Sequence, residues 1–175
     1  MDVMSIVEHR QSGQALLMKG MFDKLPTWQN FIDHMNAMSK NTHDSVGHKG
    51  AFNGHVGGIN FWHPLTLTIE RATKEFFPEI NNYMLRIKKM HPNLPSFPFT
   101  AISFTTSEPT TQRHTDPSDV FYLQCIGNVI WETTVDDVVT QYHLEPGDLI
   151  YVPTGCLHEV KSLTPRAAIS FPWKV

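Results

Sequence analysis

Two short segments of the sequence carry side chains suited to bind a metal ion. In the first, His114 and Asp116 lie two positions apart on a presumed strand, so both side chains leave the same face. In the second, a Gly-Asp turn, an apolar strand from Leu149 to Val152 and a Pro-Gly turn lead to His158. Two histidines and one carboxylate bind one face of an octahedral Fe(II) ion and leave three positions open. The sequence therefore predicts a metal site made of His114, Asp116 and His158.

Short strands are expected to position these ligands. After Pro98 the sequence changes to β-branched and aromatic runs separated by Pro, Gly and Asp, which is the pattern of consecutive strands. The expected strands are Phe99–Thr106, Gln112–Asp116, Val120–Cys125, Val129–Val135, Val139–His143, Leu149–Val152, His158–Leu163 and Ala167–Phe171. Strands that follow one another so closely are typical of a β-sandwich or a jelly-roll barrel. In a barrel, strands far apart in sequence lie side by side, which would bring His158 to His114.

The N-terminal half of the sequence mixes helices with a strand. Residues Ala15–Phe22 have the composition of a strand, and apolar residues at helical spacing predict a helix from Thr27 to Met38. A second helix is expected from Pro78 to Met90, because a following His-Pro pair ends helices. Residues Lys40–Asn60 are rich in glycine and are expected to form a long loop that contacts the substrate. The fold class is therefore mainly β with N-terminal helices.

Length and composition suit one globular domain covering residues 1–175, with 41% hydrophobic and 18% charged residues. Within it, residues 1–94 are expected to support a barrel core formed by residues 97–173. The net charge of −3 indicates no broad phosphate-binding surface, so nucleic acid is not indicated as a partner. No apolar run reaches the length of a membrane span, and the start lacks the pattern of a signal peptide. Two cysteines are too few for a disulfide framework, so a cytoplasmic location is expected.

The run from His114 to Trp131 carries a resemblance to a known family; it reads HTDPSDVFYLQCIGNVIW. Together with the segment from Leu144 to His158, it resembles cupin-type 2-oxoglutarate oxygenases, especially JmjC-domain hydroxylases such as the ribosomal oxygenases. The resemblance covers residues 97–173, the catalytic domain only. It implies a double-stranded β-helix, Fe(II), and 2-oxoglutarate and O2 as co-substrates. It also implies decarboxylation to succinate and CO2, coupled to hydroxylation of an unactivated C–H bond. The analogy favours a protein or peptide side chain as substrate, with a small molecule as the alternative.

One position departs from the family pattern. These hydroxylases typically carry Lys or Arg fifteen residues after the first metal-binding histidine, where it pairs with the distal carboxylate of 2-oxoglutarate. Here that position is Val129. A buried dicarboxylate still needs a cation, and the best candidate is Arg166, whose planar guanidinium suits a carboxylate. The alternative role for Arg166 is a salt bridge to an acid such as Glu132, and Lys161 is the second candidate cation.

Three hydroxyl side chains are expected to assist the candidate cation. Ser170 lies four positions after Arg166 on the same expected strand, so both side chains can face inward. Thr111 and Tyr122 carry hydroxyl groups that suit hydrogen bonds to the co-substrate. Two other functions remain open from the sequence. One is a metal-dependent cupin that does not use 2-oxoglutarate, and the other is a jelly-roll binding module without enzymatic activity. Asp116 among the expected ligands and Arg166 on the last expected strand argue against the cupin that does not use 2-oxoglutarate.

Overall fold

Two antiparallel sheets and three helices form the part of the chain that the computed structural model describes, which is residues 3–39, 54–56, 59–63, 65–91, 97–106 and 109–173. The helices are α1 (Val3–Ser12), α2 (Trp28–Ser39) and α3 (Ile80–Lys88). The strands are β1 (Leu16–Met18), β2 (Gly54–Val56), β3 (Ile59–His63), β4 (Thr66–Ile69), β5 (Phe99–Ser103), β6 (Pro109–His114), β7 (Asp119–Ile126), β8 (Val129–Val135), β9 (Val138–Leu144), β10 (Leu149–Val152), β11 (Leu157–Ser162) and β12 (Arg166–Trp173).

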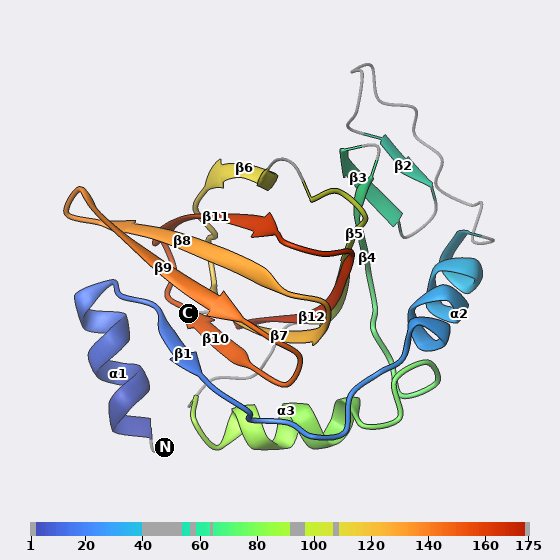
Figure 1. The fold of residues 1–175 in the computed structure, drawn as a ribbon. Coiled ribbons are helices and arrows are strands. Elements are labelled where there is room, and N and C mark those ends of the chain that lie inside the picture. Colours follow the sequence, from blue (N-terminus) through green and yellow to red (C-terminus); the bar gives the residue numbers. More distant parts are fainter. Residues whose placement is uncertain are drawn as a thin grey trace.

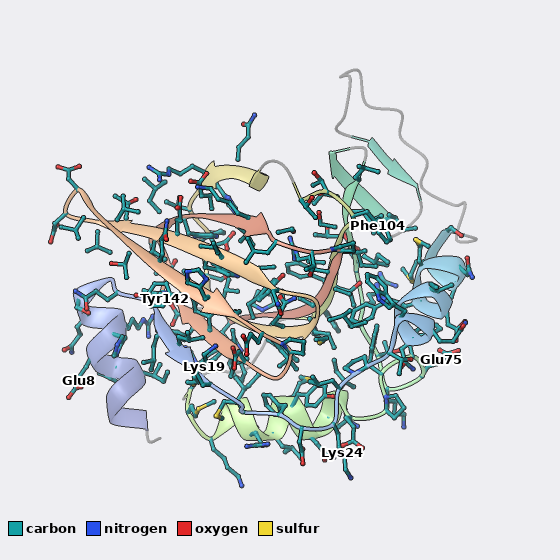
Figure 2. The ribbon with its side chains drawn as sticks, viewed as in Figure 1. Glu8, Lys19, Lys24, Glu75, Phe104 and Tyr142 are labelled. Atoms are coloured by element: carbon teal, nitrogen blue, oxygen red, sulfur yellow. The ribbon has the colours of Figure 1, made fainter. Side chains whose placement is uncertain are left out.

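The two sheets face each other as the walls of a barrel (Figure 1). The larger has the strand order β1-β10-β7-β12-β5-β4-β3-β2, and the smaller has the order β6-β11-β8-β9. Strands distant in sequence are paired, as when β12 lies between β7 and β5. Side chains from both sheets point into the space between them (Figure 2). Tyr142 of β9, labelled there, donates a hydrogen bond of 3.1 Å to the Ala15 carbonyl and ties the small sheet to the segment before β1.

Strands β7, β10 and β12 of the larger sheet are buried on both faces. The central strand β7 has almost every residue buried, because alternate side chains face the barrel interior and the helices. Phe121 and Leu123 belong to the core shared with the helices, where Phe31 of α2 and Ile80 of α3 also lie. Tyr122 belongs to the core inside the barrel. The helices thus cover the outer face, and the interior remains lined by alternate strand residues.

One turn fixes the start of the last strand. Gly127, between β7 and β8, adopts a positive φ of 75°, which favours glycine. A Cβ at this position would collide with the carbonyl of Pro165, the residue just before Arg166. Only glycine therefore allows the β7–β8 turn to pack against the segment that places Arg166 at the barrel interior.

The eight strands expected after Pro98 are all present, with ends that differ by a few residues. The N-terminal half differs more. Helix α1 was not expected, and the strand expected over Ala15–Phe22 is limited to Leu16–Met18, because the chain turns at Gly20, which has a φ of 57°. The loop expected over Lys40–Asn60 is wrong for its last part, since β2 and the start of β3 lie there; residues 40–53 lie outside the described residues.

The four strands β1 to β4 join the same large sheet as β5, β7, β10 and β12. The segment expected to support the barrel therefore also extends it. No helix in the described part of the chain has both the length and the apolar character needed to cross a membrane.

Candidate metal centre

The structure brings His114, Asp116 and His158 together at one end of the small sheet. His114 ends β6 and lies directly opposite His158 of β11 in the strand register. The Asp116 carboxylate lies 3.9 Å from His114 Nε2 and 3.6 Å from His158 Nε2. One ligand atom from each residue lies within 4.8 Å of the other two. Two imidazole nitrogens and a carboxylate oxygen at this spacing fit a single divalent ion.

The sequence argument for Asp116 was wrong in one detail. The strand expected over Gln112–Asp116 ends at His114, and Asp116 lies in the loop that follows. The two side chains meet because the chain turns after His114, and not because they share one face of a strand. Asp116 is held there by its own backbone carbonyl, which accepts hydrogen bonds from Gly155 N (3.0 Å) and Thr154 Oγ1 (3.2 Å).

Both histidines are oriented by the backbone. The Nδ1 of His114 lies 2.7 Å from the Gln112 carbonyl, and the Nδ1 of His158 lies 2.9 Å from the Cys156 carbonyl. Since a carbonyl only accepts, each Nδ1 carries the proton, and each Nε2 keeps a lone pair directed toward the shared site. Burial lowers the pKa of His158, and this outweighs the hydrogen bond to Cys156 and the nearby Asp116. His158 is therefore neutral near pH 7, the form that binds metal.

Asp119 joins the two segments that carry the candidate metal ligands. Its buried carboxylate accepts a hydrogen bond of 2.9 Å from the backbone N–H of Thr154. Thr154 in turn contacts the Asp116 carbonyl, so the turn before His158 and the loop after His114 are held together. The same carboxylate lies 2.9 Å from His91 Nε2 and accepts a hydrogen bond of 3.0 Å from the Tyr151 hydroxyl.

The environment of Asp119 favours its ionised form. Burial by itself would raise the pKa of Asp119, but the hydrogen bonds from His91, Thr154 and Tyr151 and the guanidinium of Arg10, at 3.5 Å, hold the pKa below its usual range. A carboxyl group with a lowered pKa stabilises the fold above its unfolded pKa. This stabilisation is lost as the pH falls through the folded pKa.

We expect Asp119→Asn to lower the free energy of unfolding by about 2–4 kcal/mol at pH 7, because a buried charge with several donors is removed. Urea unfolding at pH 7 and at pH 3 measures the effect. The difference between the variant and the wild type should shrink at pH 3, where the wild-type carboxylate is closer to protonation. A difference that is as large at pH 3 as at pH 7 would contradict an electrostatic role.

Arg166 lies at the inner face of β12, with only 2% of its surface exposed. It shares strand parity with Ala168, which lies in the core inside the barrel. Its Nε donates a hydrogen bond of 3.1 Å to Ser162 Oγ, and its Nη1 donates to the Tyr122 hydroxyl. Burial raises the pKa of Tyr122 to about 12, although Arg166 opposes this, so the phenol keeps its proton. The hydroxyl that accepts from Arg166 therefore still has a hydrogen to donate.

Arg166 lies near Val129, the position where the family pattern has a cation. Val129 is buried inside the barrel and is paired with Ser162 across β8 and β11. Because the Arg166 guanidinium contacts Ser162, a cation from β12 reaches the neighbourhood of position 129. Ser162 was not expected at the site. Its parity with His158 on an alternating strand is the signal by which the sequence indicates that it faces inward.

The other expected residues are placed differently. Lys161 lies on the outer face of β11, where its Nζ is 2.7 Å from Glu132 and 3.7 Å from Glu159. Glu132 is thus paired with Lys161, and the hydrogen bond from Lys161 is the main cause that lowers the pKa of Glu132 to about 2. Ser170 is buried and is paired with Tyr122 across β12 and β7. Thr111 lies opposite Val160 on β6, and its side chain is outside the described residues.

The fold and the site define a double-stranded β-helix with two histidines and one carboxylate at one end of the barrel. Solved structures of the ribosomal oxygenase YcfD from Escherichia coli have this fold. The structure with cobalt and 2-oxoglutarate matches with a TM-score of 0.69 at 19% identity, covering 100% of this chain and 52% of that one. The structure with cobalt and succinic acid matches with a TM-score of 0.68 at 18% identity over the same shares.

The likeness confirms at the level of the fold the resemblance that the HTDPSDVF run indicated. This chain spans about half the length of the YcfD chains. No family model matches the sequence. No curated protein matches it either.

Proposed function

We propose that the protein is an Fe(II)- and 2-oxoglutarate-dependent dioxygenase that hydroxylates an unactivated C–H bond and releases succinate and CO2. The observation that carries this function is the meeting of His114, Asp116 and His158 with both Nε2 atoms directed at the carboxylate. A ferrous ion bound there would supply oxygen activation, because this ligand set leaves coordination positions for a co-substrate and O2. The fold of a ribosomal oxygenase that binds cobalt and 2-oxoglutarate supports the same function.

The chain's own residues would hold the two ends of the co-substrate. The triad offers the metal end, and the buried guanidinium of Arg166 offers a cation for the distal carboxylate. Tyr122 offers a further hydroxyl donor beside that cation, and Ser170 and Thr111 are proposed to complete the binding site from neighbouring strand positions. Burial between the two sheets would strengthen each of these interactions, because the effective dielectric constant falls there.

Anaerobic titration of the Fe(II)-loaded protein with 2-oxoglutarate tests this function. We expect a weak visible charge-transfer band that grows with added 2-oxoglutarate and is absent from His114→Ala. Fe(II) binding without the band would favour a cupin that does not use 2-oxoglutarate. A protein that binds no Fe(II) would favour a jelly-roll binding module.

We propose a protein or peptide side chain as the substrate, in the cytoplasm. The likeness to a ribosomal oxygenase supports this class, and the two cysteines, both buried and free, suit a reducing compartment. Incubation of the Fe(II)-loaded protein with purified ribosomes, followed by intact-mass measurement of the ribosomal proteins, tests the class. The expected result is the addition of one oxygen atom with succinate in equal amount. Succinate formed with a small metabolite and not with any protein would contradict it.

A further inference from the structure

Trp131 of β8 lies between the metal-binding residues and the buried cation. Its indole ring stacks on His158, with ring centroids 5.1 Å apart and an interplanar angle of 24°. The same ring meets Tyr122 edge-on at 4.9 Å and 65°. Since the Tyr122 hydroxyl accepts a hydrogen bond from Arg166, these contacts form a continuous row from the candidate metal site to Arg166 inside the barrel.

The indole N–H of Trp131 is buried without an acceptor. Only 3% of the Trp131 surface is exposed, and Nε1 has no hydrogen-bond partner among the residues that the structure describes. A buried N–H that lacks an acceptor destabilises a protein, and buried indoles usually find a partner. An oxygen-rich ligand in the barrel would supply the acceptor that the described residues do not.

We propose that the Trp131 indole N–H donates a hydrogen bond to the bound oxo-acid, so that Trp131 is a co-substrate-binding residue. This inference rests on the proposed function. A 2-oxoglutarate molecule with one end at the triad and the other at Arg166 extends along the row that contains Trp131. It carries two carboxylates and a keto group, all of them acceptors, and an N–H that donates to a charged acceptor forms one of the stronger hydrogen bonds.

Trp173 provides a matched control. It is fully buried, and its Nε1 also lacks an acceptor among the described residues. It lies on the other side of the large sheet, in the core shared with the helices, with its ring 5.0 Å from His91 and 5.9 Å from Phe121. A co-substrate inside the barrel does not reach it.

The test uses the full chain loaded with Zn(II), which is diamagnetic, and 15N-labelled at tryptophan. Trp131→Phe and Trp173→Phe identify the two indole N–H resonances, each by the signal that disappears. On addition of 2-oxoglutarate we expect the Trp131 resonance to move downfield and the Trp173 resonance to stay. Calorimetry should show binding of 2-oxoglutarate weakened about tenfold or more in Trp131→Phe and unchanged in Trp173→Phe.

The outcomes separate this role from the proposed function. If wild-type protein binds 2-oxoglutarate while the Trp131 resonance stays in place, the hydrogen bond is absent and the inference is wrong, whatever the stability of the variant. Equal affinity in wild type and a folded Trp131→Phe would also overturn it. If the wild type binds no 2-oxoglutarate at all, the proposed function and this inference are both wrong. The Fe(II)-loaded protein would then also show no charge-transfer band, which identifies the proposed function as the source of the failure.

Discussion

Arg166→Met is expected to keep Fe(II) binding and to weaken 2-oxoglutarate binding by about a hundredfold or more. The guanidinium is buried, and it would face a carboxylate in a space where no water replaces the lost hydrogen bonds. Methionine is unbranched and uncharged, so the substitution removes the guanidinium and keeps an apolar chain in part of its space. Calorimetric titration of Mn(II)-loaded protein measures the affinity, and thermal melting of the same sample shows whether the variant is folded.

Lys161→Met is the control for this change, because it removes a cation from the same region of the barrel on its outer face. Lys161 is paired with Glu132 and Glu159 and is 40% exposed. We expect its 2-oxoglutarate affinity to equal that of the wild type. If Lys161→Met weakens binding and Arg166→Met does not, the assignment of the distal carboxylate to Arg166 is wrong.

A second substitution tests whether Arg166 takes the place of the family's usual cation. Val129 is paired with Ser162, which Arg166 contacts, so a lysine at position 129 would deliver its charge to the same neighbourhood. We expect Val129→Lys to restore part of the affinity lost in Arg166→Met. The same substitution in the wild type would place two cations together and is expected to reduce stability.

The sequence was sufficient to predict the strands of the barrel core and the three residues that meet at the candidate metal site. The runs after Pro98 are short, rich in β-branched residues and separated by turn residues, and each of them forms a strand in the structure. His158 was placed near His114 only by assuming a barrel, and the register confirms that they are directly opposite. The prediction succeeded because a turn-strand-turn context limits where a histidine after it can lie.

Other features depend on contacts that no local pattern indicates. Gly54–Val56 follows a glycine-rich stretch and carries little strand signal, and it becomes β2 by pairing with β3 at the edge of the large sheet. The aromatic and β-branched residues of β3 and β4 are a local strand signal, although no strand was expected there. No local pattern marks Asp119, yet His91 approaches it from one distant segment, and Tyr151 and Thr154 approach it from another. The hydrogen bond of Arg166 to the Tyr122 hydroxyl likewise follows from the pairing of β12 with β7, which the sequence does not determine.

His158→Ala is expected to lower the affinity for Mn(II) or Fe(II) by more than about a hundredfold. Removing a group that only hydrogen-bonds to a metal ligand lowers metal affinity by up to about a hundredfold, and removing the ligand itself should lower it further. His158 is the most buried member of the triad, with 2% of its side chain exposed against 40% for His114 and 33% for Asp116. Its Nε2 is fixed by the hydrogen bond at Nδ1 and by the stacked ring of Trp131. The remaining two ligands, both partly exposed, would hold a metal weakly.

Thermal melting with and without Mn(II) reads out this loss, because a ligand that binds only the folded state stabilises it by about 2.7 kcal/mol at a hundred times its Kd. Wild-type protein should melt at a higher temperature with Mn(II), and His158→Ala should not. His143→Ala is the matched control, since His143 is an exposed histidine of β9 outside the triad, and it should respond as the wild type does. A metal-dependent rise in the His158→Ala protein as large as in wild type would show that the ion binds elsewhere. His114 and His158 would then not form a metal site, because loss of the buried His158 imidazole must weaken the binding of any ion that it coordinates.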